Sequence, residues 1–412
     1  MNIQRCKGTQ DLTPEQMKKF RFIESVFRDC CIRWGYDEVR TPTLEYLHLF
    51  TSTGTLTPGR LNRVYSFLDW DGWSGERVVM RPDGTIPIAR MYIDSAANGK
   101  PAKLFYVTNV FAFEETGKES REKWQCGVES LGAGSTASDV ELITMALEVL
   151  KKSGIRYSQL KLSHAGLIRR LLDKFGLSRE EQAKAFDEIL DGNEKVLKRL
   201  KEEKPDLSRI LTPLLDLKGK SSGFLKNMKA LFGKDLPELE SEMDNFISVV
   251  EKLEEMGIRY RIDISSGSGF EYYTGIIYQI IASGVHIGGG GRYDALIPLM
   301  GGGDVPASGF ALYLDRVMEK AKIDTTPETG SVLVRTADEA NLKGAFDLVK
   351  SLHEAGYIAG MDPGNGSDAA EADWVIEVGA GEIPFTVWDM KSGTNSGAAT
   401  KAEVLKRVKG SE

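Results

Sequence analysis

A run of four glycines, Gly288 to Gly291, constrains the fold of this chain more than any other feature. It lies in the segment from Ile264 to Arg316, where glycine clusters separate two apolar, strand-like runs, and three tyrosines flank it: Tyr272, Tyr273 and Tyr293. Because glycine has no side chain, a ligand can approach the backbone closely there, so the run could form the wall of a small-molecule pocket built on a sheet. Glycine runs are more often flexible turns, and strand tyrosines are more often packing residues. The segment alone leaves both interpretations open.

Length and composition predict a soluble protein of several domains. At 412 residues the chain exceeds the size at which one hydrophobic core stops growing, so two or three domains are expected. Its 41% hydrophobic and 27% charged residues are typical of globular proteins. No apolar run approaches the roughly 20 residues of a membrane span, and the first residues lack the apolar core of a secretory signal. We therefore expect a cytoplasmic protein with no membrane partner.

The cysteines and histidines give no sign of a disulfide framework or a metal site. Neither set shows the spacing that such sites require. We expect reduced packing thiols, no metal and no cofactor. The residues concerned are Cys6, Cys30, Cys31, Cys126, His48, His164, His286 and His353.

The charge balance argues against a nucleic-acid-binding surface. The net charge is −7, and residues 331–412 hold 8 Lys or Arg against 13 Asp or Glu. Because affinity for nucleic acids depends on neutralising phosphates, an acidic domain is not expected to grip RNA. Two basic clusters, KVLKRLKEEK and DLKGKSSGFLKNMK, contain or adjoin acidic residues, so a solvated helix face is the favoured interpretation of both.

Periodicity predicts the domain organisation. An amphipathic helix is expected from Pro14 to Trp34, and the region from Ala165 to Met256 is helical in composition, as an insertion would be. A capping box at Ser138 predicts another helix, which ends at Lys152. We expect a main domain of residues 1–164 and 257–322, a helical insertion of residues 165–256, and a small α/β domain of residues 330–412.

Two predicted strands carry candidate binding residues. Leu104 to Glu114 and Trp124 to Leu131 are expected to pair antiparallel. Since strand side chains alternate between faces, Gln125, Gly127 and Glu129 share one side. A glutamine and a carboxylate on one face suit an ammonium group; the alternative is a solvated strand face.

Several long motifs in order resemble the class II aminoacyl-tRNA synthetases, and within them histidyl-tRNA synthetase, over Lys7 to Glu319. KGTQDLTP and GYDEVRTPTLE resemble the family's opening and motif 1, and RPDGT its amino-acid-binding loop. NVFAFEE with REKWQCGVESLG resembles motif 2, GFEYYTG and GGGGRYDAL the two histidine motifs, and GFALYLDR motif 3. The implied fold is α+β: an antiparallel sheet of six or seven strands flanked by helices.

The resemblance implies a histidine pocket. Its expected α-amino partners are Asp83, Thr85, Gln125 and Glu129. The residues expected to hold the imidazole and close the pocket are Tyr272, Tyr273 and Tyr293.

The catalytic arginines of the family are incomplete here. Ala112 and Ser268 stand where two arginines are expected, and Glu271 replaces an aspartate, which leaves Arg121 and Arg316 at the nucleotide site. Charge develops at the α-phosphate during adenylation, and each missing donor costs on the order of 10²–10³ in rate. We therefore expect no catalytic residues and no synthetase activity.

RPDGTIPIAR and SHAGLIRRLL resemble a paralogous family, the regulatory subunits of short-form ATP phosphoribosyltransferase. That resemblance implies a non-catalytic subunit of histidine biosynthesis which binds histidine and mediates feedback control. Its implied partners are the catalytic phosphoribosyltransferase chain and a second copy of itself, within a hetero-oligomer; tRNA is not expected. The alternatives are an active histidine–tRNA ligase and a stand-alone amino-acid-binding protein.

Overall fold

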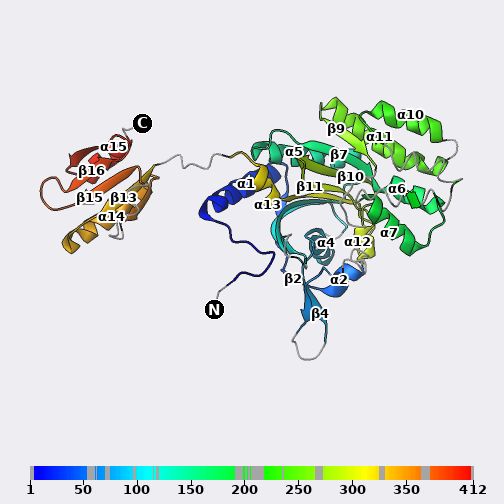
Figure 1. Cartoon of the computed structure of the whole chain (residues 1–412), viewed down its shortest axis with the longest axis horizontal. Coiled ribbons are helices and arrows are strands. Elements are labelled where there is room, and N and C mark those ends of the chain that lie inside the picture. Colours follow the sequence, from blue (N-terminus) through cyan, green and yellow to red (C-terminus); the bar gives the residue numbers. More distant parts are fainter. Residues whose placement is uncertain are drawn as a thin grey trace. The chain divides into compact units, whose positions relative to one another are not determined.

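The computed structural model describes residues 4–52, 61, 63–69, 75–95, 99–114, 116, 120–190, 198–199, 202, 205, 218–233, 236–264, 272–323, 330–362 and 372–409. The chain forms two compact units, Met1–Ile323 and Asp324–Glu412 (Figure 1). Among the helices in these ranges, none is both long enough and apolar enough to cross a bilayer.

A nine-stranded sheet forms the centre of the larger unit. Its strands are β1 (Asp37–Glu38), β5 (Ala102–Phe111), β6 (Glu122–Leu131), β7 (Gln159–His164), β8 (Lys218–Gly219), β9 (Tyr260–Asp263), β10 (Ile276–Ala282), β11 (Val285–Arg292) and β12 (Ala307–Tyr313). Their order is β1-β5-β6-β12-β11-β10-β7-β9-β8. The strands from β5 to β7 in this order pair antiparallel, as the family resemblance predicts, and the short strands β1 and β9 join this group by parallel pairing.

Helices cover both faces of this sheet. They are α1 (Pro14–Arg33), α4 (Thr85–Asp94), α5 (Thr136–Lys152), α12 (Leu296–Leu299) and α13 (Leu314–Lys320). The sheet curves around α4, whereas α1, α5 and α13 lie outside the curve (Figure 1). The predicted apolar face of α1 is buried, and Phe27 packs edge-on against Phe105 of β5 with 5.8 Å between ring centroids.

The start of α5 differs from its prediction. Ser135, not Ser138, caps the helix and accepts a hydrogen bond from the Ser138 amide. Ser138 is buried instead, with its hydroxyl 3.5 Å from that of Ser308 on β12. The capping-box pattern therefore marked the right helix but the wrong residue.

The four-glycine run lies within strand β11 and is not a turn. A Cβ atom added at Gly289 would lie 2.4 Å from the Tyr278 carbonyl oxygen, and one added at Gly290 would lie 2.1 Å from that of Gly309. Real Cβ atoms do not approach so closely, so only glycine fits between β10 and β12. Of the two interpretations, the sheet wall is correct.

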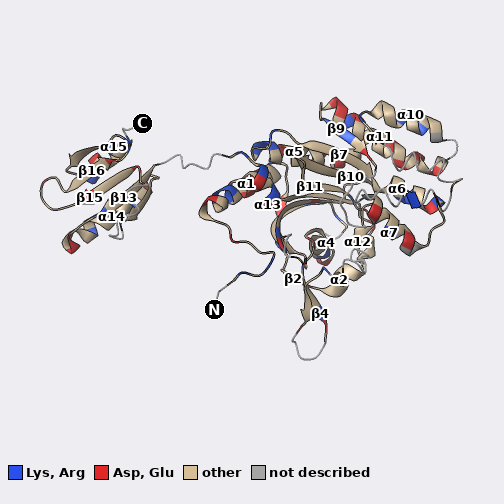
Figure 2. Ribbon diagram, viewed as in Figure 1, with Lys and Arg blue, Asp and Glu red and all other residues tan. Residues whose placement is uncertain are grey.

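A helical region lies beside β7 and β10 (Figure 1). It contains α6 (Ala165–Lys174), α7 (Arg179–Leu190), α10 (Ser222–Phe232), the 3₁₀ turn η1 (Pro237–Leu239) and α11 (Glu240–Glu255). Strand β8 departs from the all-helical prediction because it pairs with β9. The charges of α10 are basic and those of α11 are mostly acidic (Figure 2), and the two helices pair across their surface, with Lys226 and Glu251 2.5 Å apart.

A small sheet extends below the large sheet in the view of Figure 1. It consists of β2 (Leu44–Tyr46), β3 (Ser66–Leu68) and β4 (Arg77–Met80), next to α2 (Leu47–Thr51). Strand β4 pairs antiparallel with both β2 and β3.

The C-terminal unit has its own core. Its elements are β13 (Ser331–Arg335), η2 (Glu339–Asn341), α14 (Leu342–Glu354), β14 (Ile358–Met361), β15 (Trp374–Val378), β16 (Phe385–Asp389), β17 (Thr394–Ala398) and α15 (Lys401–Lys409). The strand order is β14-β13-β15-β16-β17. Val334, Leu348 and Ile376 are fully buried between sheet and helices. Among the described residues, strands β14, β15, β16 and β17 follow one another without an intervening helix, and β14, β17 and α15 carried too weak an apolar pattern to be recognised in the sequence.

Candidate functional site

A pocket opens on the face of the large sheet that curves around α4. It encloses about 440 Å³ of unfilled space, including its open mouth. Six of the seven predicted histidine-binding residues line it, and Glu129 bonds to two of these. The full lining is Asp83, Thr85, Gln125, Tyr272, Tyr273, His286, Gly289, Tyr293, Gly309, Phe310, Ala311 and Tyr313.

Strand register builds the floor of the pocket. Glu129 on β6 lies opposite Gly309 on β12, and Gln125 lies opposite Tyr313. This places both predicted β6 residues on the pocket face, which excludes the alternative of a solvated strand face. A Cβ atom at Gly309 would lie 2.1 Å from the Glu129 Oε2 atom, so the glycine provides the space that the carboxyl group fills.

The Glu129 carboxyl group is buried, and its hydrogen-bond partners among the described side chains include no cation. Its side chain is almost fully buried. Thr85 Oγ1 donates to Oε1 at 2.8 Å, and the Tyr293 hydroxyl donates to Oε2. Burial raises the pKa of Glu129 to about 8, although these hydroxyl donors favour the charged form. A cationic ligand group would stabilise the ionised carboxylate.

Asp83 supplies a second carboxyl group beside the first. It precedes α4, and its Oδ2 accepts a hydrogen bond from the Ile86 amide at 2.9 Å. Burial raises the pKa of Asp83 to about 6, while the amides of the first helical turn oppose the rise. Two neighbouring buried carboxyl groups give this end of the pocket a strong preference for positive charge.

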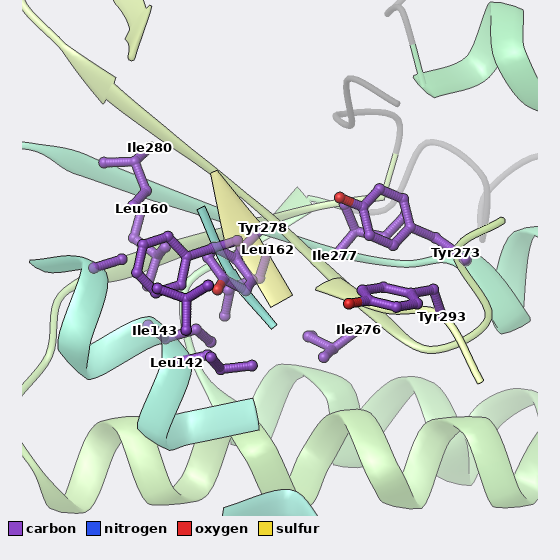
Figure 3. Close-up of a cluster of buried hydrophobic side chains, with 14 of the residues drawn as sticks. Leu142, Ile143, Leu160, Leu162, Tyr273, Ile276, Ile277, Tyr278, Ile280 and Tyr293 are labelled. Carbon is purple, nitrogen blue, oxygen red and sulfur yellow. The ribbon is translucent and has the colours of Figure 1, made fainter. Parts of the chain in front are cut away.

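Three tyrosines enclose the pocket beside the carboxyl groups. Tyr272 packs edge-on against Tyr293 with ring centroids 5.4 Å apart, and it lies 5.2 Å from Tyr273. Figure 3 shows Tyr273 and Tyr293 side by side, away from the apolar cluster that Tyr278 forms with Leu142 and Ile143. Burial raises the pKa of Tyr273 and Tyr293, so their hydroxyl groups remain neutral donors.

Tyr106 lies next to the pocket residues without lining the pocket, and the motifs did not indicate it. Added Cβ atoms at Gly84 and Gly127 would lie 2.5 Å and 2.1 Å from atoms of its side chain, so the ring fills the space that these two glycines leave. Burial and the carboxyl group of Glu129 raise its pKa well above the ordinary value. Its place opposite Gly127 in the predicted strand pair was the available signal.

The two arginines assigned to a nucleotide site contact carbonyl groups and rings. Arg121 Nε donates to the Glu114 carbonyl at 2.7 Å, and its guanidinium lies 4.8 Å from the centre of the Phe113 ring. Arg316 Nη1 donates to the His286 carbonyl at 2.8 Å. Neither arginine lines the pocket, and the lining described above contains no Lys or Arg.

Of the two positions where the family resemblance led us to expect an arginine, the structure describes one. Ala112 is half-buried in the β5–β6 hairpin, where its amide donates to the Arg121 carbonyl at 3.0 Å. Ser268 and Glu271 lie outside the described residues.

Two other arginines near the site are committed to the fold. Arg81 donates to the carbonyls of Thr41, Pro42 and Asn109 at 2.8 to 2.9 Å. Arg292 pairs with Asp139 at 2.9 Å on the opposite face of the sheet. Within the described ranges, no group of three or more His, Cys, Asp or Glu side chains suits a metal ion, and all four cysteines are free.

Sequence relatives and a family model match most of the chain. The model described as Histidyl-tRNA synthetase matches residues 8–317. A Dehalococcoides mccartyi protein named ATP phosphoribosyltransferase regulatory subunit is 48% identical over 412 residues, covering 100% of this chain and 99% of that protein. A Methanosarcina acetivorans protein named histidine–tRNA ligase is 33% identical over 436 residues, covering 100% of both chains.

Solved structures share the fold. A Bacillus halodurans protein described as an ATP phosphoribosyltransferase regulatory subunit/histidyl-tRNA synthetase superposes with a TM-score of 0.77 at 23% identity, covering 92% of this chain and 100% of that one. The histidyl-tRNA synthetase of a Nostoc species also gives 0.77, at 19% identity and with 100% of both chains covered. These identities support the fold alone.

Proposed function

Since this chain belongs to the histidyl-tRNA synthetase family, we propose that it is a non-catalytic regulatory subunit of ATP phosphoribosyltransferase which binds histidine in the pocket beside Glu129. The relative that is 48% identical along the whole chain carries that name. The relatives named histidine–tRNA ligase match at 30 to 33% identity. The proposal takes the function of the more similar group.

The composition of the pocket is the observation that carries the proposal. Asp83 and Glu129 are buried, and each lacks a basic partner among the described side chains. The Gln125 Oε1 atom is buried without a hydrogen-bond partner and faces the same space. A ligand with an ammonium group would satisfy these acceptors, and the tyrosines would enclose a flat ring.

The contacts of the basic side chains around the pocket support the proposal that the chain binds an amino acid without adenylating it. Amino-acid adenylation places growing negative charge on the α-phosphate, which requires positive groups aimed at it. Arg81 and Arg292 bond to the protein itself, and Arg121 and Arg316 also donate to backbone carbonyls. Their contacts stabilise the scaffold of the pocket.

Feedback control follows from the proposal by linkage. If histidine binds one assembly state of the complex better than another, its binding shifts the complex toward that state, and the partner must change histidine affinity by the same factor. The proposed partners are a catalytic phosphoribosyltransferase chain and a second copy of this chain. Neither tRNA nor a cofactor is part of the proposed feedback control.

The second candidate is an active histidine–tRNA ligase, which the full-length matches with ligases at up to 33% identity favour. Histidine-dependent exchange of pyrophosphate into ATP separates the two candidates. We expect the purified chain to give no exchange above a blank. Exchange at a rate typical of a synthetase would reject the regulatory assignment.

Assembly tests the partner. The chain should copurify with a short catalytic ATP phosphoribosyltransferase chain, and histidine should change the rate of the reconstituted complex. Glu129→Gln should assemble normally but remove the response to histidine. Failure of the wild-type chain to assemble would instead favour a stand-alone amino-acid-binding protein.

A further inference from the structure

Tyr106 on β5 lies between the floor of the pocket and the start of α4. It pairs with Gly127 of β6, and because paired residues share a face, its side chain points to the same side of the sheet as Glu129. A Cβ atom added at Gly127 would lie 2.4 Å from the Tyr106 hydroxyl oxygen, and one added at Gly84 would lie 2.5 Å from it. The hydroxyl group is therefore held beside the residues that flank these two glycines.

The Tyr106 hydroxyl group is buried and makes no hydrogen bond of ordinary geometry with the described residues. Burying a hydroxyl group without such a bond is unfavourable. Tyr278 on β10 has a hydroxyl group in the same condition, but it lies among apolar side chains, next to Leu142 and Ile143 (Figure 3). The two tyrosines form a matched pair that differs in what surrounds the oxygen atom.

Carboxyl and hydroxyl groups surround the Tyr106 oxygen. Burial raises the pKa of Tyr106, and the carboxyl groups of Glu129 and Asp83 raise it further. Burial also raises the pKa of Glu129, and three hydroxyl groups oppose that rise because they favour the charged carboxylate. They belong to Tyr293, Thr85 and Tyr106. The Tyr106 hydroxyl group is thus close enough to Glu129 to stabilise its charged form.

The Glu129 carboxyl group has room for a third donor. Thr85 donates to Oε1 and Tyr293 donates to Oε2, whereas an ionised carboxylate can accept about four hydrogen bonds. Hydrogen bonds to a charged acceptor are shorter and about twice as strong as those between neutral groups. Because a hydroxyl hydrogen rotates about its C–O bond, the Tyr106 hydroxyl group needs only a small movement to donate one.

One cation also lies near the Tyr106 hydroxyl group. Burial lowers the pKa of Arg81, and Tyr106 partly offsets the fall. The Arg81 guanidinium donates to the carbonyls of Pro42 and Asn109 at 2.8 Å, so it is engaged by the backbone. The titratable groups that act on this hydroxyl group among the described residues include Arg81, Asp83, Glu129 and Tyr293.

We propose that Tyr106 is a positioning residue whose hydroxyl group donates a third hydrogen bond to Glu129 when that carboxyl group ionises against the cationic group of an amino-acid ligand. Tyr106 acts through Glu129 and lies outside the lining that the ligand would touch. The carboxyl proton passes to water, so binding should strengthen as pH rises. This inference rests on the proposed function, because it concerns the same pocket.

Two variants that each lose one buried hydroxyl oxygen test it. Tyr106→Phe and Tyr278→Phe both keep the ring. Calorimetric titration of histidine into the full-length chains at about pH 7 should give binding about 10-fold weaker for Tyr106→Phe and within about 2-fold of wild type for Tyr278→Phe. Neither variant should melt below wild type, because each loses a hydroxyl group that had no hydrogen bond.

The pH dependence of histidine affinity separates the proposed role from ring packing. In wild type, the affinity should rise up to about pH 8, where Glu129 is ionised before the ligand binds, since burial raises the pKa of Glu129 to about 8. In Tyr106→Phe the rise should continue about one pH unit further, so the two proteins should converge above about pH 9. Titration of the ligand itself is common to all three proteins and cancels in the comparison.

Three results overturn the inference and leave the proposed function in place. One is a Tyr106→Phe chain that binds histidine as wild type does. Another is an equal weakening at every pH, as a change in packing would give. The third is a Tyr106→Phe chain that does not fold, because the hydroxyl group would then stabilise the fold itself. Failure of the wild-type chain to bind histidine at all would reject the proposed function, and this inference with it.

Discussion

The two faces of the large sheet treat buried carboxyl groups differently. On the outer face, Asp139 of α5 accepts two hydrogen bonds from Arg292, and burial raises its pKa only to about 6. On the pocket face, the partners of Glu129 among the side chains that the structure describes are hydroxyl groups, and burial raises its pKa to about 8. The outer pair is complete without a ligand. The pocket face holds a carboxyl group that a cationic ligand would complete.

This difference assigns structural and binding roles within one sheet. Arginines stabilise the outer face and the edges, while the pocket lining keeps acidic and aromatic groups. Three substitutions and one truncation test that division, in order of decreasing expected effect.

The largest effect is expected when the outer pair is broken. Arg292→Met leaves Asp139 buried and unpaired, which costs about 3–5 kcal/mol of unfolding free energy. Urea denaturation would measure it. Lys226→Met removes an exposed ion pair with Glu251 and serves as the control, with little change expected. If both variants unfold at the same urea concentration as wild type, the outer face does not depend on its ion pair.

The pocket face should lose stability as pH rises, when the buried Glu129 carboxyl group is forced to ionise. The pKa of Glu129 in the folded chain, about 8, lies above its ordinary value of 4.5, so the native state holds this proton more tightly. The resulting stability is fully present below about pH 4.5 and is lost as pH rises through about 8. Without ligand, wild type should lose on the order of a few kcal/mol more than Glu129→Gln between about pH 5 and 9.

Urea unfolding of both proteins across that range is the measurement. Asp83 contributes in the same direction at lower pH, since burial raises its pKa to about 6. That share remains in the variant and acts as an internal reference. Identical pH profiles would mean that Glu129 is not the buried acid described.

A smaller, local effect is expected when the space for the carboxyl group is filled. Gly309→Ala places a methyl group 2.1 Å from Glu129 Oε2, so the carboxyl group must move. Overpacking of this kind costs about 1–3 kcal/mol, and histidine binding should weaken with it. At Gly303 the nearest atom would be 3.9 Å away, so Gly303→Ala is the matched control. Equal histidine affinities in the two variants would count against the pocket geometry.

The smallest effect is expected from removal of the C-terminal unit. The two units have separate cores, and the pocket lining belongs entirely to the first. A chain that ends at Ile323 should bind histidine within about 2-fold of the full-length affinity. Calorimetry on the truncated chain would show it. A large loss would mean that the acidic unit takes part in binding.

Much of the fold was predictable because it depends on local patterns. The apolar spacing of α1 and the paired strands β5 and β6 were visible in the residues. Period-two alternation was enough to place Gln125 and Glu129 on one face. Strand β17, whose sequence is TNSGA, has no apolar alternation to recognise, and it forms because its backbone pairs with β16.

The pocket residues that lie in recognisable sequence motifs could be predicted. Those that depend on strand register or on the distance between strands could not. Tyr272, Tyr273 and Tyr293 stand in recognisable motifs, and they meet in the pocket. His286 depends on a β-bulge, which shifts register and has no reliable sequence pattern. The glycine run was ambiguous because its role depends on how closely β10 and β12 approach it.

Calorimetric titration of histidine into the wild-type chain and Glu129→Gln tests the central claim most directly. The account predicts one histidine per wild-type chain, and binding at least about 30-fold weaker in the variant, because the buried partner of a cationic group is lost. Undiminished binding by a folded Glu129→Gln chain, or no binding by wild type, would contradict it.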